Sequence, residues 1–409
     1  MIQNFYGCKD YNADEYRKID KIVNIIREQS RLLNIKEMDT PAIEYTDLLL
    51  NKYGEEAESK LIFNLGEHGL GKISGSLRYD MTVPLVRFMA QNRLTFIRRL
   101  QIGKVFRRDK PTPESGRLCE FYQADCDIVG EYESVTSEVE LIWLIKTVLE
   151  NLGIDGYDIR YNYRQNLVSM CGKIGVKGKG VKDVCASIDK LDKMSWKDVS
   201  VELRERRGLS DKQIFKLREM IDSEYMAEEM VDFDEKFVRL SGCDKLLFTA
   251  SLARGLDYYT GLIYEVVVRD SGVKTVIAGG RYDRLMYFMS KSGQKRYLPA
   301  IGVSFGVSRL CMLLDDVACR CGEGDVYIVS ADLDMRIKLC EMFRDKGFIV
   351  DYEVNKRKII KSITYAVKND FKYCVIYGES GENVKVKELF NRDADKVYTL
   401  DELRITKFD

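Results

Sequence analysis

The N-terminal part of the chain carries apolar residues at the spacing of a helix. They follow Asn12, a residue type that often caps helices, and recur three and four positions apart: Ile19, Ile22, Val23, Ile26 and Leu33. This pattern predicts an amphipathic helix with one face against the core. Residues 77–130 are instead strand-like, because β-branched and aromatic residues dominate them. Within this region, the Pro- and Gly-containing segment 109–116 predicts a loop between two strands.

Helical patterns fill the middle of the chain. Residues 134–152 predict a helix, because Ser137 and Glu140 have the spacing of a capping box and Gly153 follows as a stop signal. From 163 to 244 the chain is rich in charges and poor in strand signals. Several short helices are therefore expected there.

Strand-like patterns return in the last third of the chain. Residues 257–269 and 274–278 predict two strands with a turn between them, and 298–314 predicts a strand that runs into a helix. Residues 315–324 lack periodicity and are typical of a linker. Short apolar strands then alternate with helical patterns: 326–329, 348–350 and 373–376. This alternation predicts a small α/β domain at the C-terminus.

Composition narrows the possible classes of protein. A length of 409 residues is enough for two to four domains at roughly 100–200 residues each. The 65 Lys and Arg residues balance 65 Asp and Glu residues, which excludes a histone-like basic binder but allows local basic patches. Apolar residues (45%) and charged residues (32%) are typical of a globular chain. No apolar window approaches the ~20 residues that span a bilayer, so no membrane association is expected.

The single histidine and the eleven cysteines limit the available chemistry. Any Ser-His-Asp or Cys-His pair would have to use His68, which we expect in a surface loop, and a His-rich metal site is excluded. The N-terminus lacks the apolar core of a signal peptide, so the cysteines are expected to be reduced thiols in the cytoplasm. Their spacing matches no zinc motif, and no metal site made by the protein alone is expected.

The predicted loop is flanked by residues suited to a nucleotide. Successive strand residues face opposite sides, so Arg107 and Phe121 can face one cleft. An arginine can hold a phosphate through two parallel hydrogen bonds, and an aromatic ring can carry a base. Gln123, Asp125 and Asp127 would share one face, where buried carboxylates require a cation or hydrogen-bond donors. The alternative interpretation is that Arg107 and Asp127 only pair with each other across the sheet.

Three glycine-containing clusters are further candidates. Residues 253–261 combine an arginine, an aspartate and paired tyrosines, which suits the rim of a polar pocket; ordinary buried tyrosines are the alternative. The two glycines of 278–283 either let the backbone approach a ligand or form a plain turn. In 302–309, glycines precede an arginine at the start of a helix, which suits a nucleotide phosphate or a stacked base. The spacing of a P-loop is absent.

Together and in this order, these segments resemble the histidyl-tRNA synthetase family of class II aminoacyl-tRNA synthetases. The matching segments are 77–84, 106–109, 116–117, 120–123, 252–261, 279–283 and 302–309. Of these, 252–261 and 279–283 are particular to the histidine enzymes, in a form similar to the eukaryotic and archaeal branch. The resemblance extends over nearly the whole chain.

The resemblance implies an α+β fold. A class II catalytic core with an antiparallel sheet would comprise 1–162 and 245–318, with a helical insertion at 163–244 and an α/β anticodon-binding domain at 325–409. Such a protein activates L-histidine with ATP to histidyl-adenylate and transfers it to the 3′ end of tRNA(His). ATP would bring Mg²⁺, no tightly bound prosthetic group is implied, and the protein would be a cytoplasmic homodimer.

Roles for single residues also follow from the resemblance. Arg107 and Arg254 would act on the α-phosphate as catalytic residues. The histidine-binding residues would be Asp80, Met81, Thr82, Arg107, Gln123, Asp127, Arg254, Tyr258 and Tyr259. Within this set, Asp80 and Thr82 would take the ammonium group of the amino acid.

The implied imidazole-reading pair is Asp127 and Tyr259, because an acceptor and a hydroxyl can satisfy both ring nitrogens. The ATP-binding residues would be Arg107, Arg117, Phe121 and Arg309. In the family, residues at the positions of Phe121 and Arg309 enclose the adenine.

Two basic clusters are candidates for tRNA contact under this resemblance. One is in the insertion: Lys173, Lys177, Lys179 and Lys182. The other is in the C-terminal domain: Lys356, Arg357, Lys358 and Lys361. Solvated lysines without a partner are the alternative. Cys119 stands where the family usually has an arginine, which affects one contact to the tRNA 5′ end.

Two other functions remain as alternatives. Catalytically inactive relatives, namely regulatory subunits of histidine biosynthesis and a tRNA-sensing kinase module, typically lose pocket residues or the C-terminal domain. This chain keeps Arg107, Arg254 and Arg309. A synthetase for another amino acid, such as proline or threonine, is disfavoured by the segment 252–261.

Overall fold

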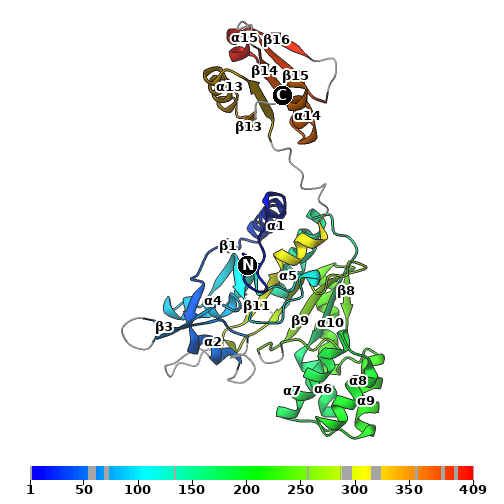
Figure 1. Cartoon of the computed structure of the whole chain (residues 1–409). Helices are drawn as coiled ribbons and strands as arrows, with labels where there is room; N and C mark the ends of the chain where they lie inside the picture. Colours follow the sequence, from blue (N-terminus) through cyan, green and yellow to red (C-terminus); the bar gives the residue numbers. More distant parts are fainter. Residues whose placement is uncertain are drawn as a thin grey trace. The chain divides into compact units, whose positions relative to one another are not determined.

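Two compact units make up the chain in this computed structural model, Met1–Asp315 and Asp316–Asp409 (Figure 1). Each unit has its own sheet and its own apolar core. The structure describes residues 2–53, 61–68, 73–132, 135–255, 258–285, 287, 297–314, 324–354, 358–378, 383–390 and 395–408.

An eight-stranded sheet is the centre of the first unit. Its strands, in spatial order, are β1 (Lys36–Glu37), β5 (Ile97–Phe106), β6 (Glu120–Val129), β11 (Ala300–Phe305), β10 (Ile277–Arg281), β9 (Leu262–Val268), β7 (Tyr157–Tyr163) and β8 (Leu246–Phe248). Only the outer pairs, β1 with β5 and β7 with β8, are parallel. All other neighbours are antiparallel, so the predicted antiparallel core is confirmed.

The first helix, α1 (Ala13–Leu32), begins where the sequence predicts. The Asn12 side chain accepts a hydrogen bond from the Glu15 amide at 2.9 Å, and the Glu15 carboxylate accepts one from the Asn12 amide. The predicted apolar face is buried at Ile19, Ile22, Val23 and Ile26. This face packs against α5 (Thr136–Asn151) and against the end of the sheet (Figure 1).

Helix α5 confirms the predicted helix, but its cap differs. Val135 is the N-cap residue, and the Glu138 carboxylate accepts a hydrogen bond from the Val135 amide at 3.1 Å. The capping box predicted at Ser137 and Glu140 is therefore wrong. Glu138 is buried and also binds Arg281, with 2.6 Å between Oε1 and Nη1, so tertiary contacts fix this end of the helix.

Residues 77–130 contain a helix that the strand-like pattern did not predict. Helix α4 (Thr82–Gln91) comes before β5 and turns its apolar face inward: Val83, Leu85, Val86 and Met89. A short apolar run cannot be assigned to helix or strand by composition alone. Pro84 lies within the first turn, where a missing amide donor costs little.

A small second sheet lies beside this helix in the first unit. It is formed by β2 (Ile43–Tyr45), β4 (Ile73–Leu77) and β3 (Asn64–His68), with β4 in the middle. Helix α2 (Thr46–Tyr53) follows β2 directly. His68 therefore lies at the end of a strand and not in a loop.

Five helices occupy the segment after β7, as predicted: α6 (Arg164–Lys173), α7 (Lys179–Ile188), α8 (Trp196–Glu205), α9 (Asp211–Asp222) and α10 (Glu228–Ser241). Helices α6 to α9 lie together at one end of the unit (Figure 1) and share an apolar core. That core continues into Leu252 and Ile263 of the sheet region. Helix α10 instead packs on α5.

The second unit is an α/β domain, as predicted. Its sheet has the order β13 (Val350–Tyr352), β12 (Val326–Ser330), β14 (Tyr373–Tyr377), β15 (Val384–Glu388) and β16 (Lys396–Tyr398). Among its described residues, three helices accompany the sheet: α13 (Leu333–Asp345), α14 (Ile359–Lys368) and α15 (Leu400–Ile405). Across both units, the described helices include none long and apolar enough to cross a membrane.

Candidate active site

One face of β6 carries the residues that the sequence placed together. In the register of β5 and β6, Phe121 lies opposite Val105 and Gln123 opposite Gly103. Asp125 and Asp127 follow on the same face, at two-residue spacing. The predicted alternation along this strand is thus confirmed.

Arg107 lies just beyond β5, above the ring of Phe121. Its guanidinium carbon is 5.1 Å from the centroid of Phe121 and 4.6 Å from that of Tyr79. Its Nε donates to the Tyr79 carbonyl at 3.3 Å. These contacts fix the plane of the guanidinium group, as the prediction of a shared cleft requires.

Asp127 pairs with Arg99 and not with Arg107. The two residues are opposite each other across β5 and β6, and Arg99 Nη2 lies 2.7 Å from Asp127 Oδ2. The Tyr282 hydroxyl donates to Asp127 Oδ1. A Cβ at Gly302 would collide with the same oxygen, so the carboxylate requires glycine there. The alternative of an Arg107–Asp127 pair is therefore wrong, because the register sets the partner.

Gln123 and Asp125 are joined through Ser304 of β11. Gln123 Nε2 donates to Ser304 Oγ, which donates to Asp125 Oδ1 at 2.6 Å. Burial raises the pKa of Asp125 to about 6; Arg99 opposes this shift and Asp127 adds to it. Gln123 Oε1 is buried and has no hydrogen-bond partner among the described residues. Such an acceptor is available for a donor of a ligand.

The segment before α4 lies against residues of β5 and the residues just after it. Asp80 Oδ1 accepts hydrogen bonds from the amides of Thr82 and Val83 at 3.0 and 3.1 Å, which fixes the start of the helix. The Met81 carbonyl accepts from Arg99 Nη2 at 3.0 Å. Arg99 thus connects this segment to Asp127 on β6.

The paired tyrosines of 253–261 face the same region. The rings of Tyr258 and Tyr259 lie 4.2 Å apart at 35°, and Tyr258 lies 6.4 Å from Tyr282, the partner of Asp127. Burial raises the pKa of Tyr259 to about 12. Leu256 and Asp257 of this segment are outside the described residues.

Glycines 279 and 280 belong to β10, so the plain turn considered for 278–283 is wrong. A Cβ at Gly280 would lie 2.8 Å from the Tyr259 ring, and one at Gly279 would lie 2.5 Å from the Tyr264 hydroxyl. Protein side chains therefore approach the strand closely, which only glycine permits.

Arg309 lies within electrostatic reach of three other arginines, among them Arg107 above Phe121. Burial lowers the pKa of Arg309, and the charges of Arg107, Arg254 and Arg117 lower it further. Arg117 pairs with Asp109 of the loop. A cluster of guanidinium groups that repel one another is stabilised by an anion with several charges, such as a polyphosphate.

Arg254 and Arg309 are held by residues that the sequence did not indicate. Arg254 Nη1 lies 2.9 Å from Glu265 Oε2 on β9. Arg309 Nη1 donates to the Thr275 carbonyl at 2.6 Å. Sequence reasoning missed these partners because contacts between different elements of the fold give no local signal in the sequence. A buried arginine partner for Asp127 could have been expected from Arg99, which lies in the strand-like segment preceding the loop.

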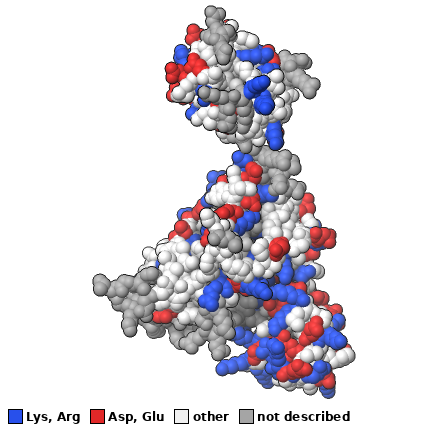
Figure 2. Space-filling model, viewed as in Figure 1, with Lys and Arg blue, Asp and Glu red and all other residues white. Residues whose placement is uncertain are grey.

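The candidate tRNA-binding lysines are exposed wherever the structure describes them: Lys173, Lys177, Lys179, Lys182, Lys358 and Lys361. Lys356 and Arg357 are outside the described residues. Basic and acidic side chains are interspersed over both units (Figure 2). No group of three potential metal ligands occurs among the described residues.

Comparison with known proteins agrees with this geometry. The family model described as "Histidyl-tRNA synthetase" matches residues 7–310. A histidine–tRNA ligase of Caenorhabditis elegans is 32% identical over 98% of this chain and 86% of its own length. A probable cytoplasmic histidine–tRNA ligase of Encephalitozoon cuniculi is 35% identical over 91% of this chain and 90% of its own length.

Solved structures share the fold. The histidyl-tRNA synthetase of Nostoc sp. PCC 7120 superposes with a TM-score of 0.76 at 23% identity and covers 98% of both chains. A Bacillus halodurans protein described as an ATP phosphoribosyltransferase regulatory subunit/histidyl-tRNA synthetase gives 0.72 at 17% identity, over 92% of this chain and 99% of that one.

Proposed function

This chain belongs to the histidyl-tRNA synthetase family, and we propose on that basis that its arginine-lined site makes histidyl-adenylate. The protein is a histidine–tRNA ligase, which activates L-histidine with ATP and transfers it to tRNA(His). The observation that supports our assignment of the site is that Arg107 lies over Phe121, on the strand face that also carries Gln123, whose Oε1 has no hydrogen-bond partner among the described residues.

The arginines suit the first half-reaction. A carboxylate oxygen of histidine attacks the α-phosphorus of ATP, and the bond to pyrophosphate breaks. Arg107 and Arg254 would neutralise charge at the α-phosphate, so no acid–base residue is required. Arg117 would bind the outer phosphates, and Phe121 and Arg309 would enclose the adenine. Mg²⁺ would arrive with ATP as part of the substrate.

Histidine recognition would fall to the buried polar groups. Gln123 Oε1 would accept a hydrogen bond from the ammonium group, beside Asp80 and Thr82. Asp127 is held in place by Arg99 and Tyr282. A fixed carboxylate can select one tautomer of the imidazole, with Tyr258 and Tyr259 against the ring.

ATP–pyrophosphate exchange with each amino acid in turn tests this function. We expect exchange with L-histidine and none with proline or threonine. Exchange with another amino acid alone would contradict the assigned specificity. Absence of exchange with every amino acid would favour an inactive regulatory relative.

The second unit is proposed to bind the anticodon arm of tRNA(His), and the insertion to contact its acceptor stem, in line with the family. The cytoplasm is the proposed location. Curated relatives carry both cytoplasmic and mitochondrial names. The nine cysteines that the structure describes are all free, which fits a reducing compartment.

We further propose a homodimer, because the first helix and the segment around Pro41 resemble the dimer motif of class II synthetases. Sedimentation at micromolar concentration should give twice the chain mass of 47.3 kDa. An active species that sediments as a single chain would refute this proposal.

A further inference from the structure

A continuous path of polar contacts joins two arginines of the site. Arg254 Nη1 lies 2.9 Å from Glu265 Oε2. The Thr275 hydroxyl donates to the same carboxylate oxygen at 2.8 Å, and the Thr275 carbonyl accepts from Arg309 Nη1 at 2.6 Å. The Thr275 hydroxyl therefore bonds to Glu265, the partner of Arg254, and the Thr275 carbonyl bonds to Arg309.

The path connects four different segments of the first unit. Arg254 lies in the segment after β8, Glu265 on β9, Thr275 just before β10, and Arg309 on α12 (Val307–Leu310). Glu265 is 1% exposed, so its charge must be compensated inside the protein. Two donors, one charged and one neutral, provide that compensation.

Arg254 has a second carboxylate within electrostatic reach. Asp189 lies in the insertion. Burial raises its pKa above the ordinary value, and the nearby charge of Arg254 partly opposes this rise. An arginine released from Glu265 would therefore have a competing partner on the insertion side. In the structure Arg254 is paired with Glu265.

We propose that Glu265 and Thr275 are positioning residues that fix the spacing of Arg254 and Arg309 for ATP. This inference rests on the proposed function of the site and deepens it. Glu265 orients Arg254, and the Thr275 hydroxyl holds Glu265 in the orientation that leaves the remaining Arg254 donors for the α-phosphate. Neither residue touches the reacting atoms.

Thr275→Val tests the inference, because it removes the hydroxyl and retains the β-branched shape and the backbone carbonyl. We expect kcat/KM for ATP in histidine-dependent exchange to fall about tenfold, the size expected for one hydrogen bond to a charged group. Thr275→Ser should restore the rate to within about twofold, since it restores the donor. Thr147→Val is the matched control, because the Thr147 hydroxyl donates to carbonyls of its own helix, α5.

Calorimetric binding of ATP with Mg²⁺ to the same variants separates the possible outcomes. Weaker binding by Thr275→Val and recovery in Thr275→Ser, at unchanged melting temperature, would support the inference. Wild-type affinity and rate in Thr275→Val, or failure of Thr275→Ser to recover, would overturn it. If the wild type binds ATP but activates no amino acid, the proposed function fails and the affinities still test the positioning.

Discussion

Replacing Arg254 with alanine is expected to slow histidine activation by about 10²–10³-fold, the usual cost of losing one donor that stabilises transition-state charge. Arg254 is held by Glu265, and its charge acts on Arg309, so it lies close to the place where the anion is expected. Arg107→Ala should have an effect of the same order. ATP–pyrophosphate exchange and single-turnover formation of the adenylate would measure both.

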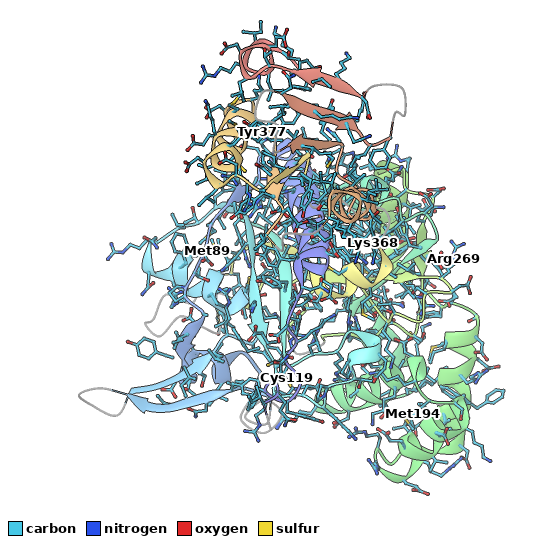
Figure 3. The ribbon with its side chains drawn as sticks, turned by 45° about the horizontal axis from the view of Figure 1, so that its top comes forward. Met89, Cys119, Met194, Arg269, Lys368 and Tyr377 are labelled. Atoms are coloured by element: carbon cyan, nitrogen blue, oxygen red, sulfur yellow. The ribbon has the colours of Figure 1, made fainter. Side chains whose placement is uncertain are left out.

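The control must separate chemistry from folding. Arg254→Ala leaves Glu265 buried without its cation, which destabilises the protein. The double variant Arg254→Ala, Glu265→Gln removes this unpaired charge and should remain as slow as the single variant. Arg269→Ala removes another ion-paired arginine, bound to Asp158 on the surface and labelled in Figure 3, and should activate histidine at the wild-type rate. Wild-type activation by Arg254→Ala would show that the assignment is wrong.

The arginines could be found from the sequence because each lies in a short, distinctive segment. Arg107 flanks a loop whose prolines and glycine are visible in the sequence, and Phe121 follows at the spacing of a strand. Period-two alternation then placed Gln123 and Asp127 on the same face. These inferences depend only on local geometry, and the structure confirms that these side chains share one face.

Partners across the sheet could not be found in the same way. Asp127 has an arginine partner, as its burial requires, but the register selects Arg99 and excludes Arg107. Register depends on how β5 and β6 align, which the residues of either strand alone do not determine. The pairs of Glu265 with Arg254 and Thr275 with Arg309 also join different segments of the chain, and the fold sets these partners as well.

The helix α4 shows a second limit. Its apolar residues occur in a run that fits a buried helix or a buried strand equally well, and the surrounding strands favoured the wrong choice. The segment forms a helix because Leu85 and Met89, one turn apart, then pack together into the core. Conversely, α1 was predicted correctly, because a long amphipathic pattern and the Asn12 cap agree with each other.

Removing lysines at the start of α14 is expected to weaken tRNA binding about 10²-fold. Lys358 and Lys361 are exposed there, and the first turn of the helix carries no acidic residue. The positive end of the helix dipole adds to their charge, so a phosphate is favoured at this place. Each phosphate contact contributes about tenfold in affinity near 0.1 M salt and about 1 in the slope of log affinity against log salt.

In the double variant Lys358→Gln, Lys361→Gln, the salt slope should fall by about 2 and KM for tRNA should rise. Removing Lys356 and Arg357 as well, which are outside the described residues, should extend both changes. ATP–pyrophosphate exchange should remain intact, because activation of histidine is expected to need no tRNA, as the family resemblance implies. Lys338→Gln with Lys396→Gln removes the same charge from exposed positions on α13 and β16, and it should leave the slope unchanged. Loss of a phosphate contact reduces the number of counterions released on binding and therefore flattens the salt slope. A wild-type slope and KM in the variant lacking all four charges would mean that the anticodon arm binds elsewhere.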